Sequence, residues 1–244
     1  MNNEKMRVIL CGANGAMGKL IDAALPGEVV GRVSIDGENN VPKTFSDLGL
    51  VSSDVLIDFS HHTAIADVLS YAKRNNMAVV VGTTGHTPEE KAMIYAAAEE
   101  LPVFYSGNMS LGIAVLCRLA KEAARYFPDA DIEIVEIHHN RKVDAPSGTA
   151  LMLFNAIREV RPGATANCGR AGEGKRTKDE IGVSALRMGT VVGIHEVHIH
   201  TGTQCLTLKH EACTRAMLAD GAVEAARFMV GKGVGLHNME NMLG

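Results

Sequence analysis

The segment between Glu136 and Ala150 holds the densest group of side chains in the chain that could do chemistry. Two histidines, His138 and His139, stand four and three residues before Lys142. An imidazolium or ammonium group can deliver a proton to a double bond that is being reduced, and general acid catalysis contributes about 10²–10⁴-fold to a rate. Lys142, His138 and His139 are therefore candidates to deliver such a proton or to place positive charge beside a substrate carboxylate.

A helix start follows these cations directly. Pro146 and Ser147 have the residue types that begin helices, and a helix N-terminus attracts anions through its unpaired N–H groups. Ser147, Gly148 and Thr149 are thus predicted to bind a substrate carboxylate, at roughly 1.5–3 kcal/mol per charge-assisted hydrogen bond. This arrangement favours an anionic substrate.

Two simpler interpretations remain open. His138 and His139 could be ordinary strand-end residues beside a solvated Lys142, although a cationic patch next to a positive helix end is unfavourable unless an anion binds there. His195, His198 and His200 also lie close together in sequence. Alternation along a strand places His195 on the face opposite the other two, so we expect no metal site.

A glycine-rich loop supplies the second candidate site. Residues 12–18 read Gly-Ala-Asn-Gly-Ala-Met-Gly, between an apolar strand and a helix, where backbone N–H groups and the helix dipole can bind a pyrophosphate. A tight strand-to-helix turn is the alternative. We expect cofactor contacts from this loop, at Gly12, Ala13, Asn14, Gly15, Ala16 and Met17.

An acidic residue stands where a dinucleotide fold holds the adenosine ribose. Asp36 ends the second strand, twenty-four residues after Gly12, and its carboxylate would accept hydrogen bonds from ribose hydroxyls while repelling a 2′-phosphate. This favours NADH, with a solvated turn as the alternative. Gly82, Thr83 and Thr84 follow the fourth strand, at the edge where open α/β sheets bind ligands. They could hold the nicotinamide ribose or carboxamide, or form a simple turn.

The elements that must position these residues alternate between strand and helix in the first half of the chain. Apolar β-branched runs predict strands, and apolar residues at helical spacing predict helices. Such alternation indicates a doubly wound parallel sheet. We expect strands at 6–11, 29–35, 55–59, 77–81 and 102–105, and helices at 17–25, 63–75, 87 to about 100 and 111–126. Thr87 and Glu90 supply a capping box for the start of the third helix.

The pattern changes after Pro128. Residues 132–138, 190–200 and 204–210 alternate apolar and polar side chains, which is typical of a mixed or antiparallel sheet with one solvated face. Residues 167–180 are rich in Gly, Arg and Lys, and we expect an exposed loop that could close over an anionic substrate or simply be solvated. Residues 220–230 predict a last helix that packs back on the first domain.

Composition excludes several classes of protein. The net charge of −4 lacks the basic excess that nucleic-acid binding needs, and no apolar run approaches the roughly 20 residues of a membrane span. The five cysteines are scattered, with no pair spaced for zinc or redox chemistry. We expect a cytoplasmic protein with neither nucleic acid nor membrane as a partner.

These motifs together resemble the dihydrodipicolinate reductase (4-hydroxy-tetrahydrodipicolinate reductase) family over essentially the whole length. The glycine loop, Gly82-Thr83-Thr84-Gly85, Ser106-Gly107-Asn108-Met109-Ser110 and Glu136-Ile137-His138-His139 all match. The most specific stretch runs from Lys142 through Asp-Ala-Pro-Ser-Gly to Thr149. The match continues at Glu180-Ile181-Gly182 and from Val192 to Glu196.

The resemblance implies an α/β fold: a Rossmann-type dinucleotide-binding domain, residues 1–108 and 212–244, and an α+β domain with a mixed sheet, residues 109–211, that binds substrate and builds a homotetramer. It implies NADH or NADPH as cofactor and reduction of the cyclic imine dicarboxylate 4-hydroxy-tetrahydrodipicolinate to tetrahydrodipicolinate, a step towards diaminopimelate and L-lysine. By position it makes His138 and Lys142 catalytic, with Lys142 as the proton donor, and His139, Gly148 and Thr149 substrate-binding. It adds cofactor contacts at Ser106, Gly107, Asn108 and Met109.

Two departures bear on the cofactor. Many members carry Arg where this chain has Ala16 and Gly37, and both losses remove positive charge from the position of a 2′-phosphate. A different small dicarboxylate as substrate, or a non-catalytic dinucleotide-binding protein, are the competing hypotheses. Arg187-Met188-Gly189 replaces the usual Arg-Gly-Gly, and we assign no function to it or to His195.

Overall fold

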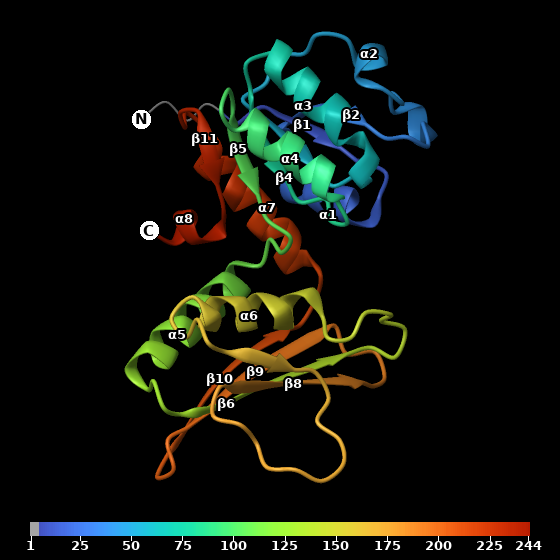
Figure 1. Ribbon diagram of the computed structural model, residues 1–244. Helices are drawn as coiled ribbons and strands as arrows, with labels where there is room; N and C mark the ends of the chain where they lie inside the picture. The colour runs from blue at the N-terminus through green and yellow to red at the C-terminus, as the bar shows by residue number, and fades with distance from the viewer. Residues whose placement is uncertain (1–4) are drawn as a thin grey trace. The chain divides into compact units, whose positions relative to one another are not determined.

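The structure is a computed structural model that describes residues 5–244. The chain forms two compact units, shown in Figure 1. The first runs up to Ser110 and is completed by Ala216–Gly244, and the second is Leu111–Arg215. The C-terminal segment belongs to the first unit because α7 (Ala216–Met229) packs on β3, β4 and β5 and because β11 (Gly235–His237) pairs with β5.

A parallel six-stranded sheet forms the centre of the first unit, in the order β11-β5-β4-β3-β1-β2. Helices cover both faces, so the inner strands are apolar without alternation; β1, β3 and β4 are buried at every residue. The order reverses at β1, which has β2 on one side and β3 on the other. The strands are β1 (Val8–Cys11), β2 (Val29–Val33), β3 (Val55–Asp58), β4 (Ala78–Val81) and β5 (Pro102–Tyr105).

The helices of this unit lie in two layers. Helices α1 and α7 pack together on one face, and α3 packs with α4 on the other (Figure 1). Thr87 and Glu90 form the predicted capping box of α4, but the helix ends at Ala97 because Glu99 and Glu100 turn back in tighter i→i−3 bonds. The helices are α1 (Ala16–Ala24), α2 (Phe45–Leu48), α3 (Ile65–Arg74), α4 (Pro88–Ala97) and α8 (Met239–Leu243), with 3₁₀ turns η1 (Glu38–Asn40) and η2 (His62–Ala64).

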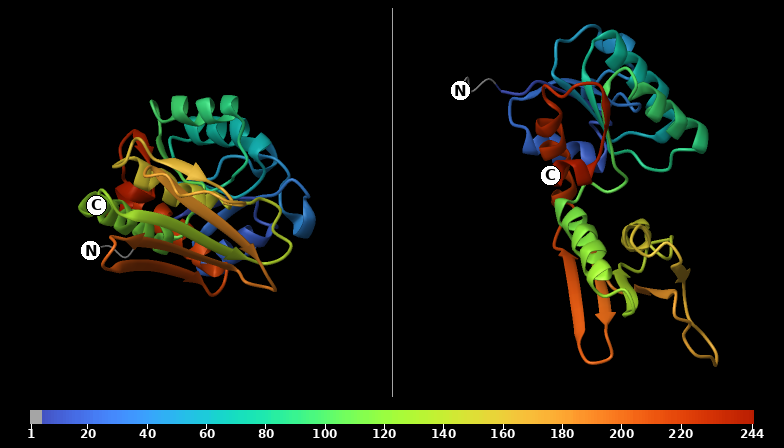
Figure 2. Two further views of the ribbon diagram at one scale, coloured as in Figure 1. Left: turned by 60° about the horizontal axis from the view of Figure 1, so that its bottom comes forward. Right: turned by 60° about the vertical axis from the view of Figure 1, so that its left-hand side comes forward.

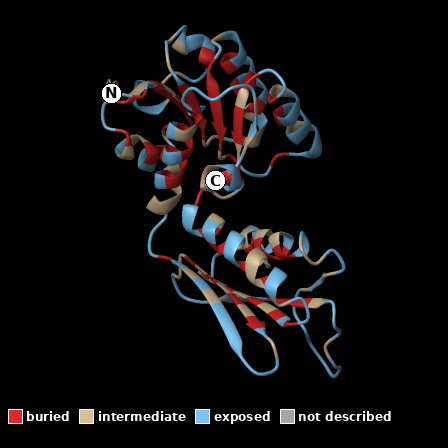
Figure 3. Ribbon diagram, turned by 90° about the vertical axis from the view of Figure 1, so that its left-hand side faces the viewer, coloured by how far each residue is buried: buried red, intermediate tan, exposed pale blue. Residues whose placement is uncertain are grey.

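The second unit is a mixed five-stranded sheet, in the order β10-β9-β6-β8-β7, with two helices on one face. Its core lies between that face and the helices (Figure 3), and α5 runs along the β9–β10 hairpin in the right-hand view of Figure 2. The parallel and mixed sheets confirm the predicted fold class. The elements are α5 (Leu111–Tyr126), β6 (Asp131–His138), α6 (Gly148–Arg158), β7 (Thr165–Asn167), β8 (Glu180–Arg187), β9 (Gly193–His200) and β10 (Cys205–Ala212).

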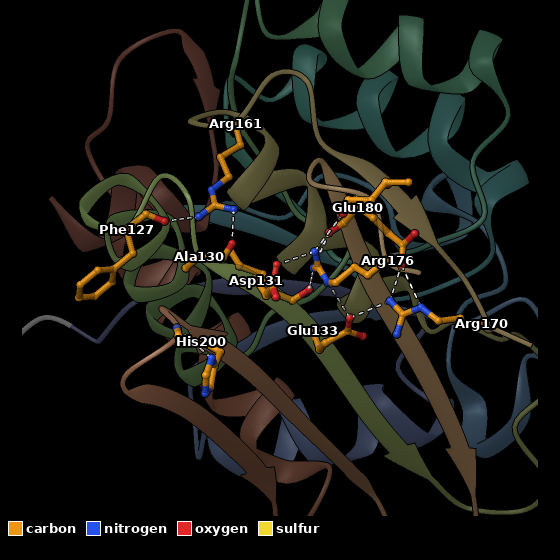
Figure 4. Close-up of polar contacts among 12 residues, drawn as sticks. Phe127, Ala130, Asp131, Glu133, Arg161, Arg170, Arg176, Glu180 and His200 are labelled. Atoms are coloured by element: carbon orange, nitrogen blue, oxygen red, sulfur yellow. Dashed lines mark hydrogen bonds and ion pairs between the residues drawn. The ribbon is translucent and has the colours of Figure 1, made fainter. Parts of the chain in front are cut away.

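The basic loop between β7 and β8 is exposed, and its two arginines are bound to the sheet (Figure 4). Arg170 pairs with Glu133, at 2.9 Å, and with Glu180. Arg176 donates to the carbonyl oxygens of Ile132 and Glu180 and pairs with Asp131 at 3.0 Å. These side chains therefore fasten the loop to strands β6 and β8.

Within residues 5–244, none of the helices combines the length and the apolar character that a membrane crossing requires.

Candidate active site

The predicted catalytic histidine lies beside a buried carboxylate. Alternation along β6 places Glu136 and His138 on the face covered by the helices, where Glu136 is 0% exposed and His138 is 8% exposed. The imidazole Nδ1 is 2.5 Å from Glu136 Oε2. Arg187, at the end of β8, approaches the same carboxylate with both terminal nitrogens at 2.8 Å. The register of the parallel β6–β8 pair sets Arg187 next to His138.

Charge compensation keeps Glu136 ionised. Burial by itself would raise the pKa of a carboxyl group, but hydrogen bonds from Arg187, His138 and the Ser147 backbone outweigh it, so the pKa of Glu136 lies below its usual value. The side chain is a buried anion with a partner on each oxygen.

Lys142 and His139 occupy the bend between β6 and α6. The Lys142 ammonium is 2.8 Å from Asp144 Oδ1, and its side chain is 21% exposed. Burial, together with the charges of Arg141 and Arg215, lowers the pKa of His139. His139 is half-buried. The Lys142–Asp144 ion pair thus lies in the bend that directly follows His138.

The start of α6 lies next to this group. Ser147 is buried, and its polar groups are engaged within the protein: its N–H donates to Glu136 Oε1 at 3.0 Å, and its hydroxyl accepts from the Ala150 N–H at 3.2 Å. Gly148 is exposed and Thr149 half-buried in the first turn. The structure therefore brings the candidate catalytic and carboxylate-binding residues of this unit together.

His195, which the sequence left without a role, belongs to the same cluster. It is buried on β9, its Nε2 lies 3.3 Å from the Ser147 hydroxyl, and its ring meets that of His138 edge to face at 5.1 Å. His198 and His200 lie on the other face of β9, as predicted. Burial, reinforced by the charge of His138, lowers the pKa of His195 from 6.5 to about 4. The ring is neutral at physiological pH.

This neutral histidine makes the folded chain sensitive to acid. Because the pKa of His195 is lowered on folding, its contribution is fully present above pH 6.5 and is lost as the pH falls to about 4, since only the unfolded chain binds the proton in that range. The loss is on the order of 3 kcal/mol. We expect His195→Phe to flatten the dependence of unfolding free energy on pH, as measured by urea denaturation.

His198→Phe, on the opposite face of β9, is the control and should retain the wild-type pH dependence. An unaltered slope in His195→Phe would show that another group causes the acid sensitivity.

The cofactor residues predicted in the first unit gather at the carboxyl ends of its strands. A cavity of about 290 Å³ opens there. Its lining comes from the segments that follow β1, β3, β4 and β5 and from α7, and consists of Met17, Phe59, Ser60, Gly82, Thr83, Thr84, Gly107, Asn108, Met109 and Leu218. Parallel strands end at one edge, which is why segments distant in sequence meet here.

Close backbone approach explains two glycines at this edge. Gly12 has φ +84°, and a Cβ there would lie 2.3 Å from the Phe59 carbonyl oxygen. A Cβ on Gly82 would lie 2.3 Å from the Phe59 ring. The N–H groups of Gly12 and Ala13 donate to the Val33 carbonyl oxygen, so they hold the loop on β2. Gly15 is the N-cap of α1, so the loop leads directly into the N–H groups of a helix start. This geometry fits a pyrophosphate.

Asp58 holds the loop after β3 in place. This loop was not among the site residues predicted from the sequence. Its Oδ1 accepts from the Ser60 hydroxyl at 2.5 Å, and the Ser60 N–H donates to Thr83 Oγ1 at 2.9 Å. Burial raises the pKa of Asp58. In the sheet, β3 lies between β1 and β4, so the loop after β3 lies beside the loops that follow those two strands. This strand order could have indicated Phe59 and Ser60 as site residues.

Asp36 is bound to the glycine loop. The side-chain amide of Asn14 donates to Asp36 Oδ1 at 2.5 Å, and this hydrogen bond lowers the pKa of Asp36. The Lys43 side chain packs against Gly37, the residue after Asp36: a Cβ on Gly37 would lie 2.5 Å from Lys43 Cε. The ribose position predicted for Asp36 thus combines a carboxylate with a nearby lysine stem.

Comparison with known proteins covers both units. The family model "Dihydrodipicolinate reductase, N-terminus" matches residues 6–109, and the model "Dihydrodipicolinate reductase, C-terminus" matches residues 112–243. The 4-hydroxy-tetrahydrodipicolinate reductase of Caldanaerobacter subterraneus is 42% identical, with 98% of each chain covered. That of Clostridium novyi is 40% identical over 97% of this chain and 98% of its own.

Comparison with solved structures agrees with the family models. Dipicolinate-bound dihydrodipicolinate reductase from Paenisporosarcina sp. TG-14 has a TM-score of 0.79 and 25% identity, covering 98% of this chain and 99% of its own. An amine dehydrogenase from Mycobacterium smegmatis, at 13% identity and a TM-score of 0.63 over 98% of this chain and 96% of its own, shares the fold. With both halves matched and relatives of 40% identity and more over nearly full length, the chain belongs to the dihydrodipicolinate reductase family.

Proposed function

We propose that this protein reduces 4-hydroxy-tetrahydrodipicolinate to tetrahydrodipicolinate with a nicotinamide dinucleotide, in the formation of diaminopimelate and L-lysine. The observation that carries the proposal is the group formed by His138, Lys142 and the start of α6, in a chain whose relatives bear the name of this activity. A protein that only binds the dinucleotide has no use for a proton donor beside a carboxylate site.

The residues of the second unit have distinct roles in this proposal. His139, Gly148 and Thr149 bind the carboxylates of the cyclic imine, with Ser147 holding the helix start in place. A bound nicotinamide would supply the hydride for a ring carbon. Lys142 delivers the proton that completes the reduction, and the 4-hydroxyl leaves as water together with a proton of the adjacent ring carbon. Asp144 holds the Lys142 ammonium at 2.8 Å and orients it before substrate binds.

The residues of the first unit hold the cofactor. Main-chain N–H groups at the start of α1, directly after the glycine loop, receive the pyrophosphate, and Met17 is in the lining of the adjoining cavity. The same cavity supplies polar groups for the nicotinamide ribose and carboxamide from Gly82, Thr83, Thr84, Gly107, Asn108 and Met109. Ser106 supports the last of these segments, since its hydroxyl donates to the Asn108 carbonyl at 2.7 Å.

The direct test supplies the unstable cyclic imine enzymatically in the cuvette and follows oxidation of NADH and of NADPH. Consumption of either nucleotide that requires the imine supports the proposal. Failure to oxidise both, in protein shown to bind the nucleotides, would contradict it and would favour another dicarboxylate as substrate.

Asp36 sets the cofactor preference in this proposal, with both nucleotides accepted. Its carboxylate, oriented by Asn14, binds the ribose hydroxyls of NADH and repels a 2′-phosphate, while Lys43 beside Gly37 offsets that repulsion. We expect Asp36→Ala to raise KM for NADH more than KM for NADPH, in steady-state kinetics with each nucleotide.

Glu38→Ala is the charge-matched control, because it removes a neighbouring exposed carboxylate and leaves Asp36 in place. An equal effect of Asp36→Ala on both nucleotides would remove Asp36 from the ribose site.

The face of the mixed sheet opposite the helices supports a homotetramer. Val135, Ile137, Leu186 and Ile194 form an apolar row there, by the register of β6 with β8 and β9. Leu186 is 37% exposed. A second copy of this chain is the proposed partner, and sedimentation equilibrium measures the mass of the assembly.

A further inference from the structure

Glu136 is surrounded by hydrogen-bond donors. Its Oε1 accepts from the Ser147 N–H at 3.0 Å and from Arg187 at 2.8 Å. Its Oε2 accepts from the second Arg187 nitrogen at 2.8 Å and from His138 Nδ1 at 2.5 Å. A carboxylate has about four acceptor sites. All of them are used, by three different elements of the second unit.

The first consequence concerns the proton on His138. An ionised carboxylate can only accept, so the hydrogen bond to Glu136 requires the proton on Nδ1. The other nitrogen, Nε2, is then the atom that can take up or release a proton. A Cβ on Gly193 would lie 3.1 Å from this Nε2, so glycine keeps the imidazole uncrowded on that side.

The second consequence concerns the start of α6. Ser147 is eleven residues from Glu136 in sequence, yet its N–H is fixed to the same carboxylate that holds His138. Arg187 adds a hydrogen bond to the Asp144 carbonyl at 2.6 Å, within the bend that leads to the helix. The buried Glu136 carboxylate therefore fixes the positions of both the His138 imidazole and the helix start that carries Gly148 and Thr149.

We propose that Glu136, held by Arg187, is a positioning residue for the reduction: it fixes His138 in the Nδ1–H form and holds that imidazole in register with the carboxylate-binding start of α6. This inference rests on the proposed function. It assigns to Glu136 and Arg187 a part in catalysis that does not require either to touch substrate.

A paired substitution separates this role from stability. Replacing a buried ion pair by apolar residues of similar volume is often neutral for folding, whereas removing one partner leaves a buried charge uncompensated. We expect Glu136→Met with Arg187→Met to fold and to bind the dinucleotide, with kcat lowered about 10²-fold, as for other residues that orient a catalytic group. Affinity for dipicolinate, used as a planar dicarboxylate probe in calorimetry, should fall about tenfold.

The matched control is Glu133→Met with Arg170→Met. This pair, at 2.9 Å, joins the same strand to the loop before β8 but lies on the opposite face of the sheet. It should retain the wild-type kcat and dipicolinate affinity. A loss equal to that of the Glu136 and Arg187 variant would make the effect one of general sheet damage and overturn the proposal.

Two further measurements test the mechanism. Nitrogen-15 spectra of histidine-labelled protein should show His138 protonated on Nδ1 in the wild type and mixed tautomers in the paired variant. In a His138→Gln background, the paired substitution should lower kcat far less than in the wild type, because Glu136 then has no imidazole to position. A wild-type tautomer in the variant, or full additivity, contradicts the proposal.

The spectra do not depend on turnover, so they decide the positioning role even if the imine assay contradicts the proposed function. If the paired variant fails to fold, Arg187→Lys takes its place, since lysine keeps the charge but cannot bind both oxygens in a fork. That variant should lower kcat and weaken dipicolinate binding, and wild-type values for both would overturn the proposal.

Discussion

Lys142→Ala is expected to lower kcat for imine reduction by about 10²–10⁴-fold, the range for loss of a general acid, while dinucleotide binding stays nearly unchanged. The ammonium is 2.8 Å from Asp144 in the second unit, and the side chain is only 21% exposed. Its removal takes away the proposed proton donor and leaves the cavity lined by Gly82 and Met109 in the first unit intact. Steady-state kinetics and fluorescence titration with NADH measure the two effects.

Lys178→Ala provides a matched control. Lys178 also pairs with an aspartate, Asp129, at 2.9 Å in the same unit, but both side chains are highly exposed. Asp129 lies just before β6, at the end of the strand opposite His138. Its loss should leave kcat near the wild-type value. Reaction of Lys142→Ala at the wild-type rate would contradict the assignment of the proton donor and leave His138 as the alternative.

Local signals in the sequence predicted the elements that they fully determine. Residues 102–105 and 111–126 are a strand and a helix with the predicted bounds, because each has one unbroken pattern and clear flanking residues. Thr87 and Glu90 predicted the start of α4 correctly. The ends of elements that depend on tertiary contacts were predicted less accurately. The strand expected from residue 190, for example, begins at Gly193.

Strand β8 was not predicted from the sequence, and the site residues that it contributes were therefore missed. It contains Gly182, which lowers strand propensity, and its burial does not alternate. The structure supplies the reason for the glycine: the Glu133 carboxylate of β6 lies over it, 1.7 Å from where a Cβ would stand. This contact joins residues about fifty positions apart, so no local pattern records it.

Arg187 shows what followed from that omission. It ends β8, and only the pairing of β8 with β6 sets it beside His138 and Glu136. Glu136 itself was in the segment singled out, although without a role, and its i,i+2 spacing on β6 sets it on the same face as His138. The sequence therefore indicated the segment that forms the candidate site, but the partners contributed by β8 and β9 required the register of the sheet.

Gly12→Ala is expected to abolish dinucleotide binding that can be measured in the wild type, with KM for either nucleotide raised at least about 10²-fold. An alanine Cβ would lie 2.3 Å from the Phe59 carbonyl oxygen and 2.9 Å from Ser60 Cα, both backbone atoms, and the φ of +84° disfavours any residue except glycine. Strain at such a position costs about 1–3 kcal/mol, and relieving the overlap moves the glycine loop away from the loop that carries Ser60. Gly233→Ala, in the same unit with nothing within 4 Å of the added Cβ, should bind normally. Normal NADH affinity in Gly12→Ala would mean that the pyrophosphate is not bound by this loop.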